Sequence, residues 1–254
     1  MRPRDGRVRN HPLPPWRSPH APPAKVRGFS LFEVAIVVVI AGLLVQAVIY
    51  GQSLVESARV QALVAQQGAV TAAVLAFRDR FQAWPGDYGN TDHAIDCDGS
   101  PCTGGNDDGL VESDTGNEDI IAWTQLSASG LLSDYYRIES PTTALPSPVN
   151  TPRNVFGGYL HFASDALWGA STNAVRRPNA KAGNQIPVEV LAEVDRRIDD
   201  GRPALGGFQF SIYSAGYDEP PVTGESRCIS VDAPEASWYV PGGQANCGAA
   251  SLLN

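Results

Sequence analysis

The sequence has few of the residues, and none of the short motifs, on which most catalytic sites depend. After residue 28 it contains only two histidines, His93 and His161. It has no Gly-x-Ser-x-Gly elbow, no phosphate-binding glycine-rich loop and no His-Glu-x-x-His helix. A serine, a histidine and an aspartate can converge from distant positions, but no pattern in the chain points to such a set. We therefore predict that the protein is not an enzyme.

Positive charge and proline are missing from the stretch that follows the first 28 residues. Residues 29–50 contain no lysine or arginine and a single acid, Glu33, and no proline occurs between Pro23 and Pro85. At about 1.5 Å per residue, a helix over residues 29–50 is roughly 33 Å long, which is enough to cross a bilayer. Beyond it polar residues return gradually while one face stays apolar. The sequence therefore predicts one helix over residues 29–82, with a transmembrane segment at 29–50.

The charge of the chain is divided unevenly. The first 28 residues hold seven Lys or Arg and one acid, a net charge of +6, so a total of -8 leaves -14 for residues 29–254. A basic flank stays on the cytoplasmic side of a membrane, which predicts a basic leader peptide at residues 1–28 and export of the acidic remainder. A nucleic-acid-binding protein needs a basic stripe, so we expect no direct nucleic-acid partner.

Glu33 does not suit a plain membrane anchor. An ionised carboxylate in lipid costs on the order of a few kcal/mol unless it is paired, so Glu33 needs a cationic partner. If the chain were cut after Gly28, the new ammonium group of Phe29 would lie one helical turn from Glu33, on the same molecule or on a neighbour. The segment is therefore either a signal anchor or a processed helix with a functional acid.

The string Gly28-Phe29-Ser30-Leu31-Phe32-Glu33, followed by the apolar run, resembles the start of type IV pilins and pseudopilins. Many members of that family carry Thr-Leu where this chain has Leu31-Phe32. The resemblance implies that a prepilin peptidase and methyltransferase cuts after Gly28 and methylates Phe29. It also implies that Glu33 pairs with the amino terminus of an adjacent pilin or pseudopilin subunit.

The resemblance also implies a location. The protein would be a single-pass protein of the bacterial inner membrane with its carboxy-terminal domain in the periplasm, and it would reach a filament or the cell surface after assembly. Further strings resemble a subgroup of that family with a proline-glycine-aspartate turn after the long helix. They are Trp84-Pro85-Gly86-Asp87, Gly105-Asn106-Asp107-Asp108-Gly109 and the stretch from Asp195 to Gly201.

The rest of the chain predicts a globular domain over residues 83–254. Helical patterns occur at 120–132 and 187–198, and strand patterns at 155–162 and 208–213. The fold class is therefore α+β. Together with the resemblance, this predicts a pilin-like layout, in which the long amino-terminal helix packs on a small antiparallel sheet.

Residues 92–118 form a loop rich in acids and glycine. Such a loop offers oxygen ligands to a hard cation such as calcium, which is the one cofactor that the sequence indicates, although the spacing does not match an EF-hand. A solvated acidic loop is the alternative. The proposed calcium ligands are Asp96, Asp98, Asp107, Asp108 and Glu112.

The four cysteines permit three pairings. Because export places them in an oxidising compartment, we expect the local disulfides Cys97–Cys102 and Cys228–Cys247. A four-cysteine zinc site is the competing interpretation, but neither pair has the two-residue spacing of a zinc knuckle.

Taken together, these patterns predict a structural subunit, a minor pilin or a pseudopilin, of a type IV pilus or type II secretion filament. The alternative is a membrane-anchored periplasmic binding module that forms no filament and binds calcium.

Overall fold

The structure is a computed structural model that describes residues 28–89, 91, 94–114, 116–138, 145–169, 175–230 and 236–253. Of the expected leader, only Gly28 is among the described residues. Asp92 and His93 of the acidic loop also lie outside them. The chain divides into two compact units, Met1–Ile49 and Tyr50–Asn254. One helix, α1, contributes to both.

Helix α1 runs from Leu31 to Phe81, within one or two residues of its predicted bounds. Two properties of its sequence explain the length of α1. The helix contains no proline, and its later half has an apolar stripe at helical spacing. Val60, Leu63, Val70, Val74 and Phe77 on this stripe are buried. The helix is long and apolar enough, by length and composition, to cross a membrane.

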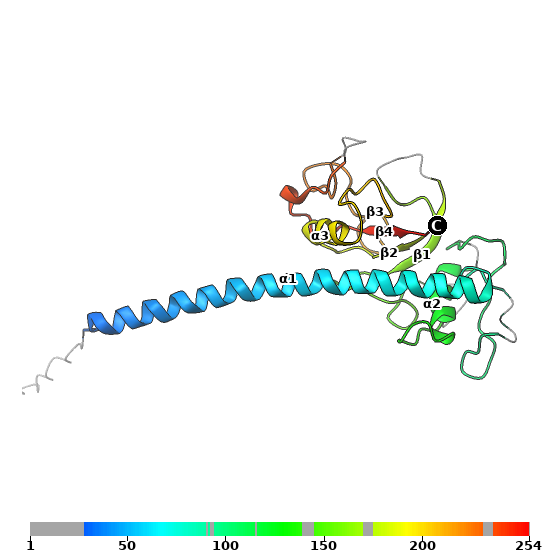
Figure 1. Cartoon of the computed structure of the whole chain (residues 1–254), viewed down its shortest axis with the longest axis horizontal. Coiled ribbons are helices and arrows are strands. Elements are labelled where there is room, and N and C mark those ends of the chain that lie inside the picture. Colours follow the sequence, from blue (N-terminus) through cyan, green and yellow to red (C-terminus); the bar gives the residue numbers. More distant parts are fainter. Residues whose placement is uncertain are drawn as a thin grey trace, which may run out of the picture. The chain divides into compact units, whose positions relative to one another are not determined.

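Four short strands form one antiparallel sheet in the order β1-β2-β4-β3. This confirms the α+β class, with a long amino-terminal helix and a small antiparallel sheet. The strands are β1 (His161–Asp165), β2 (Arg177–Lys181), β3 (Phe208–Phe210) and β4 (Ala249–Leu252). Figure 1 shows this sheet lying against the second half of α1.

The two faces of the sheet differ in polarity. Side chains alternate along each strand, so Phe162, Ala180 and Phe208 share the face that packs into the cores containing α1. His161 and Lys181 are opposite one another on the other face. The sheet therefore places an apolar surface on α1 and a buried polar row on the far side.

Two shorter helices complete the cores. Helix α2 (Glu118–Ala128) is buried along residues 118–127, and helix α3 (Val188–Ile198) is amphipathic. Trp123 of α2 belongs to the same core as Phe77, whereas Leu191 of α3 belongs to the other core, with Val60 and Leu63.

Helix α2 begins and ends earlier than the predicted span of 120–132. Gly130 has a φ of 75°, and its N–H donates to the carbonyl of Ser127 while that of Leu131 donates to the carbonyl of Leu126. This is the Schellman arrangement, which closes a helix with a left-handed residue, usually glycine. Gly130 is therefore the stop signal.

The predicted strand over 155–162 is mostly a turn, and only its last two residues enter β1. The Asn154 carboxamide folds the chain back, because its Oδ1 accepts N–H groups from Phe156 and Gly158 while its Nδ2 donates to the carbonyls of Ala182 and Asn184. Gly157, with a φ of 98°, completes the turn.

Candidate functional site

The residues expected to direct processing and assembly lie at the start of α1. Phe29 is 81% exposed, and Glu33 lies in the first turn of the helix with its side chain exposed. Among the residues that the structure describes, no cation contacts the Glu33 carboxylate. The Ser30 carbonyl accepts the N–H of Val34 at 3.2 Å and starts the helical hydrogen bonding.

Every large apolar side chain between Phe29 and Val55 is exposed. Leu31, at 88%, is an extreme example. An exposed apolar surface of this extent on a helix marks contact with lipid or with other apolar helices. Glu33 is the one acid within residues 29–50 of this surface.

The five proposed calcium ligands are not gathered around a common point. Asp107 Oδ1 accepts the N–H of Gly89 at 2.9 Å, and Asp108 Oδ1 accepts that of Leu110 at 2.9 Å. Asp96 Oδ1 accepts the N–H of Gly99 at 2.6 Å, while Asp98 is exposed.

Glu112, the fifth, forms an ion pair with Arg176 at 2.7 Å. Over the described part of the chain, the carboxylates close enough to share an ion are instead Asp195, Asp199 and Asp200, and two of these three are exposed. The acids of the loop thus mainly organise its backbone, and calcium binding stays a prediction without a preformed set of ligands.

The structure places two other carboxylates, Asp87 and Glu118, at the centre of this region. Asp87 accepts the N–H groups of Asp108 and Gly109 at 2.9 and 3.1 Å. Glu118 accepts those of Asn106 and Glu112 at 3.0 and 3.1 Å. We call these two side chains and loop 104–112 the acidic junction.

The acidic junction joins strings that lie far apart in the sequence. Gly86, with a φ of 97°, packs against the carbonyl of Glu118, where a Cβ atom would clash. Its N–H donates to Gln125 Oε1 at 2.7 Å. The Trp84–Asp87 turn, the Gly105–Gly109 loop and the start of α2 therefore form one folding unit.

Burial raises the pKa of both junction carboxyls, and that of Glu118 reaches about 6. Backbone N–H donors oppose this increase, whereas the negative charge of Asp108 adds to it at both groups. The backbone hydrogen bonds thus offset only part of the cost of burying these two carboxylates.

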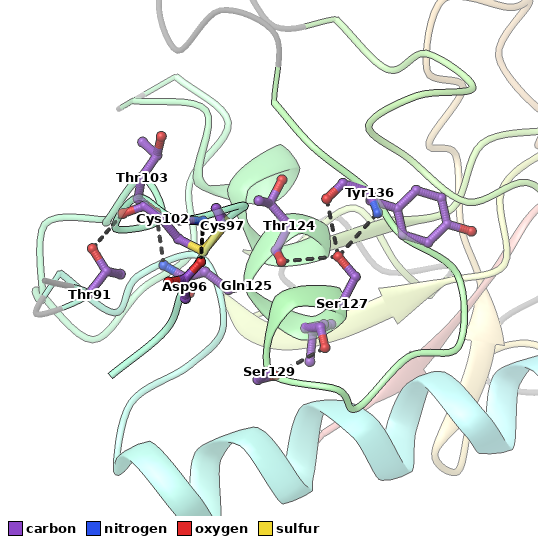
Figure 2. Close-up of a disulfide and its surroundings, with 12 residues drawn as sticks. Thr91, Asp96, Cys97, Cys102, Thr103, Thr124, Gln125, Ser127, Ser129 and Tyr136 are labelled. Atoms are coloured by element: carbon purple, nitrogen blue, oxygen red, sulfur yellow. Dashed lines mark hydrogen bonds between the residues drawn. A yellow bond between two sulfur atoms is a disulfide. The ribbon is translucent and has the colours of Figure 1, made fainter. Parts of the chain in front are cut away.

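Both expected disulfides are present, Cys97–Cys102 and Cys228–Cys247, and no described cysteine is free. Figure 2 shows the first of them beside α2, where Gln125 Nε2 donates to the carbonyl of Thr103 at 3.2 Å. Thr91 Oγ1 donates to the carbonyl of Cys102 in the same view. This disulfide closes a short segment within the acidic loop, and both of its cysteines pack on the core that contains α2. The pairing leaves no thiolates for a zinc site.

His161 has a serine and an aspartate as neighbours, but their geometry differs from that of a catalytic triad. Both Asp119 Oδ2, at 3.0 Å, and Ser113 Oγ, at 3.2 Å, lie near the same nitrogen, Nε2. In a triad the serine and the acid contact different ring nitrogens. Burial lowers the pKa of His161, so the ring is kept neutral and packs on Tyr213 with ring centroids 4.0 Å apart.

Sequence reasoning missed a second polar group on this face of the sheet, namely Asp165, Asn179 and Lys181. The Lys181 side chain is fully buried, and its Nζ lies 2.6 Å from Asp165 Oδ2. Strand β2, which carries Asn179 and Lys181, has the sequence RPNAK and lacks the β-branched and aromatic residues that mark a strand. The available signal was Lys181 itself, the only lysine after Lys25.

Comparisons of the chain with protein-family models, with curated proteins and with solved structures find no match.

Proposed function

We propose that the protein is a structural subunit, a minor pilin or a pseudopilin, of a type IV pilus or a type II secretion filament. In this proposal it is processed after Gly28, and its helix α1 assembles with those of other subunits. The observation that carries the proposal is Glu33, a carboxylate on an exposed apolar helix that no cation among the described residues contacts.

An ionised carboxylate on an apolar helix is stable only where water or a cation contacts it. When apolar helices bundle, water leaves their interface, and an unpaired carboxylate there costs several kcal/mol. The ammonium group at Phe29 of a processed neighbour would remove that cost. It would do so only when the two helices have the matching offset. Glu33 would therefore fix the register between subunits, while the apolar side chains supply most of the contact area.

The partners follow from these steps. A prepilin peptidase and methyltransferase would create the amino terminus at Phe29, the inner membrane would hold the helix before assembly, and other pilin or pseudopilin subunits would surround it in the filament. The acidic domain after the helix would be periplasmic. Its size, about 170 residues beyond Phe81, leaves room for insertions and favours a specialised subunit over a bare structural one.

Replacing Glu33 tests this proposal. Glu33→Ala and Glu33→Gln should still be processed after Gly28. Loss of a desolvated charge pair worth about 2–5 kcal/mol should reduce the yield of sheared filaments at least tenfold. Glu56→Ala, at an exposed acid of the same helix, is the matched control and should assemble normally.

A wild-type filament yield from Glu33→Ala would contradict the proposed role. The alternative, a membrane-anchored binding module, is distinguished by crosslinking. A cysteine placed near Phe29 should crosslink to the helix of another subunit in a filament, but not in a helix that only anchors a domain. Calcium binding is tested separately, since an unchanged melting temperature on adding calcium would exclude it.

A further inference from the structure

Lys181 is an unusual residue in this chain. Of the 19 Lys and Arg residues, only Lys25 and Lys181 are lysines, so almost every cation in the domain is an arginine. Lys181 lies on β2, and its side chain has no exposed surface. Arginine stays protonated in proteins, whereas a buried lysine can lose its proton and act as a nucleophile. The chain therefore uses its one domain lysine where an amine can be reactive.

A carboxamide lies next to this amine. Lys181 Nζ donates to Asn179 Oδ1 at 2.6 Å, which also brings it close to the carbonyl carbon of the Asn179 side chain. Both residues are on the same face of β2, because residues two apart in a strand point the same way. Asn179 is fully buried as well. The nucleophile and a possible electrophile are thus held together by one strand.

The Asp165 carboxyl group contacts both reacting groups. Its Oδ2 accepts from Lys181 Nζ at 2.6 Å, and its Oδ1 accepts from Asn179 Nδ2 at 3.1 Å. The N–H of Leu167 also donates to Oδ1, at 3.0 Å, and holds the carboxyl group in place. A group in this position is within reach of the proton that the amine must lose and of the nitrogen that must leave.

The surroundings act in both directions on the proton of the amine: the pKa of Asp165 is lowered despite its burial, because the charge of Lys181 stabilises the carboxylate. Burial lowers the pKa of Lys181, although the attraction of Asp165 opposes this effect. The Tyr213 ring, with its centroid 5.7 Å from Nζ, favours the charged amine, and His161 is opposite Lys181 on β1. Asp165 alone of the three has an exposed side-chain surface, at 19%, which gives a small product a route to water.

We propose that Lys181 and Asn179 join in an intramolecular isopeptide bond, with Asp165 as the catalytic residue. The Lys181 ammonium group gives a proton to Asp165, and the amine attacks the Asn179 side-chain carbonyl carbon. A second proton moves from the attacking nitrogen to Nδ2, the carbon–Nδ2 bond breaks and ammonia leaves. A carbon–Nζ amide bond has replaced the primary amide, and Asp165 keeps the first proton. No oxidant, reductant or co-reactant is required.

An ordinary buried ion pair is the competing explanation. It would account for Lys181 and Asp165, but it does not require a carboxamide that contacts both partners. The two explanations differ in a covalent bond, which survives denaturation.

The test uses the full-length chain, purified in detergent micelles, then denatured and reduced. Its intact mass should be lower by one molecule of ammonia than the mass calculated for the reduced sequence. A lysine-specific protease should also fail to cut between Lys181 and Ala182, because the amide has no charge for it to recognise. A full mass together with cleavage at Lys181 would overturn the proposal. A mass lower by ammonia with normal cleavage would also overturn it, because a cyclised Asn179 gives that result without a crosslink.

Variants then assign the roles. Asp165→Asn and Asn179→Ala should restore the full mass and the cleavage at Lys181, whereas the control Asn184→Ala, at another buried asparagine, should stay linked. A linked Asp165→Asn protein would overturn the role of Asp165. The measurements on the wild-type protein decide the proposal by themselves, so it stays testable even if a variant fails to fold.

Discussion

Asp87 shows how a single buried carboxylate can organise a loop. It is only 2% exposed, and it accepts two backbone N–H groups from residues more than 20 positions away. We expect Asp87→Ala to lower the free energy of unfolding by about 1–3 kcal/mol, because it removes two hydrogen bonds that each contribute about 0.5–1.5 kcal/mol.

Urea unfolding of the full chain in detergent micelles measures this change, and protease cleavage within loop 104–112 should increase with it. Asp114→Ala removes an exposed carboxylate nearby and should have little effect. Equal stability of the two variants would show that the acidic junction does not depend on Asp87.

The raised pKa of Asp195 predicts that the free energy of unfolding depends on pH. Burial raises its pKa from 3.8 to about 6, despite the hydrogen bond that Trp238 Nε1 donates to it at 2.7 Å. Between these two values the folded state keeps a proton that the unfolded state has released. The contribution to stability is therefore present at low pH and is lost as pH rises through about 6.

The difference in unfolding free energy between Asp195→Asn and the wild type isolates this contribution from those of other groups. The unfolding free energy of the variant should rise relative to that of the wild type between about pH 4 and about pH 6, the interval between the two pKa values, and the difference should then level off. A difference that is constant across this range would contradict the raised pKa.

Residue-level sequence reasoning succeeded where partners are close in the chain. The disulfide partners are 5 and 19 positions apart, and both pairings are confirmed. It could not find Asp165 beside Lys181, because that contact depends on the register of β1 with β2. Five acids of the 92–118 loop were proposed as calcium ligands, with a solvated loop as the alternative. Three of the five accept backbone N–H groups, and a fourth pairs with Arg176. Composition alone cannot distinguish the two uses.

At the scale of elements, α1 was the most predictable part of the fold, since a 51-residue helix without proline leaves a long periodic signal. Strands β2 and β4 were not predicted. Their sequences, RPNAK and AASL, are short and contain small or polar residues, and they are strands because their neighbours complete the hydrogen bonding.

The later half of α1 is part of the core, and a substitution at Phe77 tests this. Phe77 is fully buried and contacts Phe81 and Tyr88. We expect Phe77→Ala to destabilise the domain by about 3–5 kcal/mol through the cavity that it leaves. Leu75→Ala, at a position that is 36% exposed on the same helix, should cost much less. Thermal unfolding in micelles measures both, and similar losses would show that α1 is not the core element described above.

At the scale of the whole molecule, one helix has two surfaces with different roles. Residues 60–77 bury an apolar stripe in the domain, whereas residues 29–55 expose theirs. The domain is stabilised by its own cores and by two disulfides, so the exposed segment is not needed to complete it. This division suits a subunit whose domain folds first and whose helix then joins an assembly.

Mass spectrometry of the mature amino terminus tests the proposed function most directly. In protein extracted from membranes or filaments, we predict that the first residue is Phe29 and that its amino group is methylated. Replacing Gly28 with a bulkier residue should block the cut and leave the leader attached. A wild-type protein that retains residues 1–28 in its mature form would contradict the proposed processing, and with it the proposed partner of Glu33.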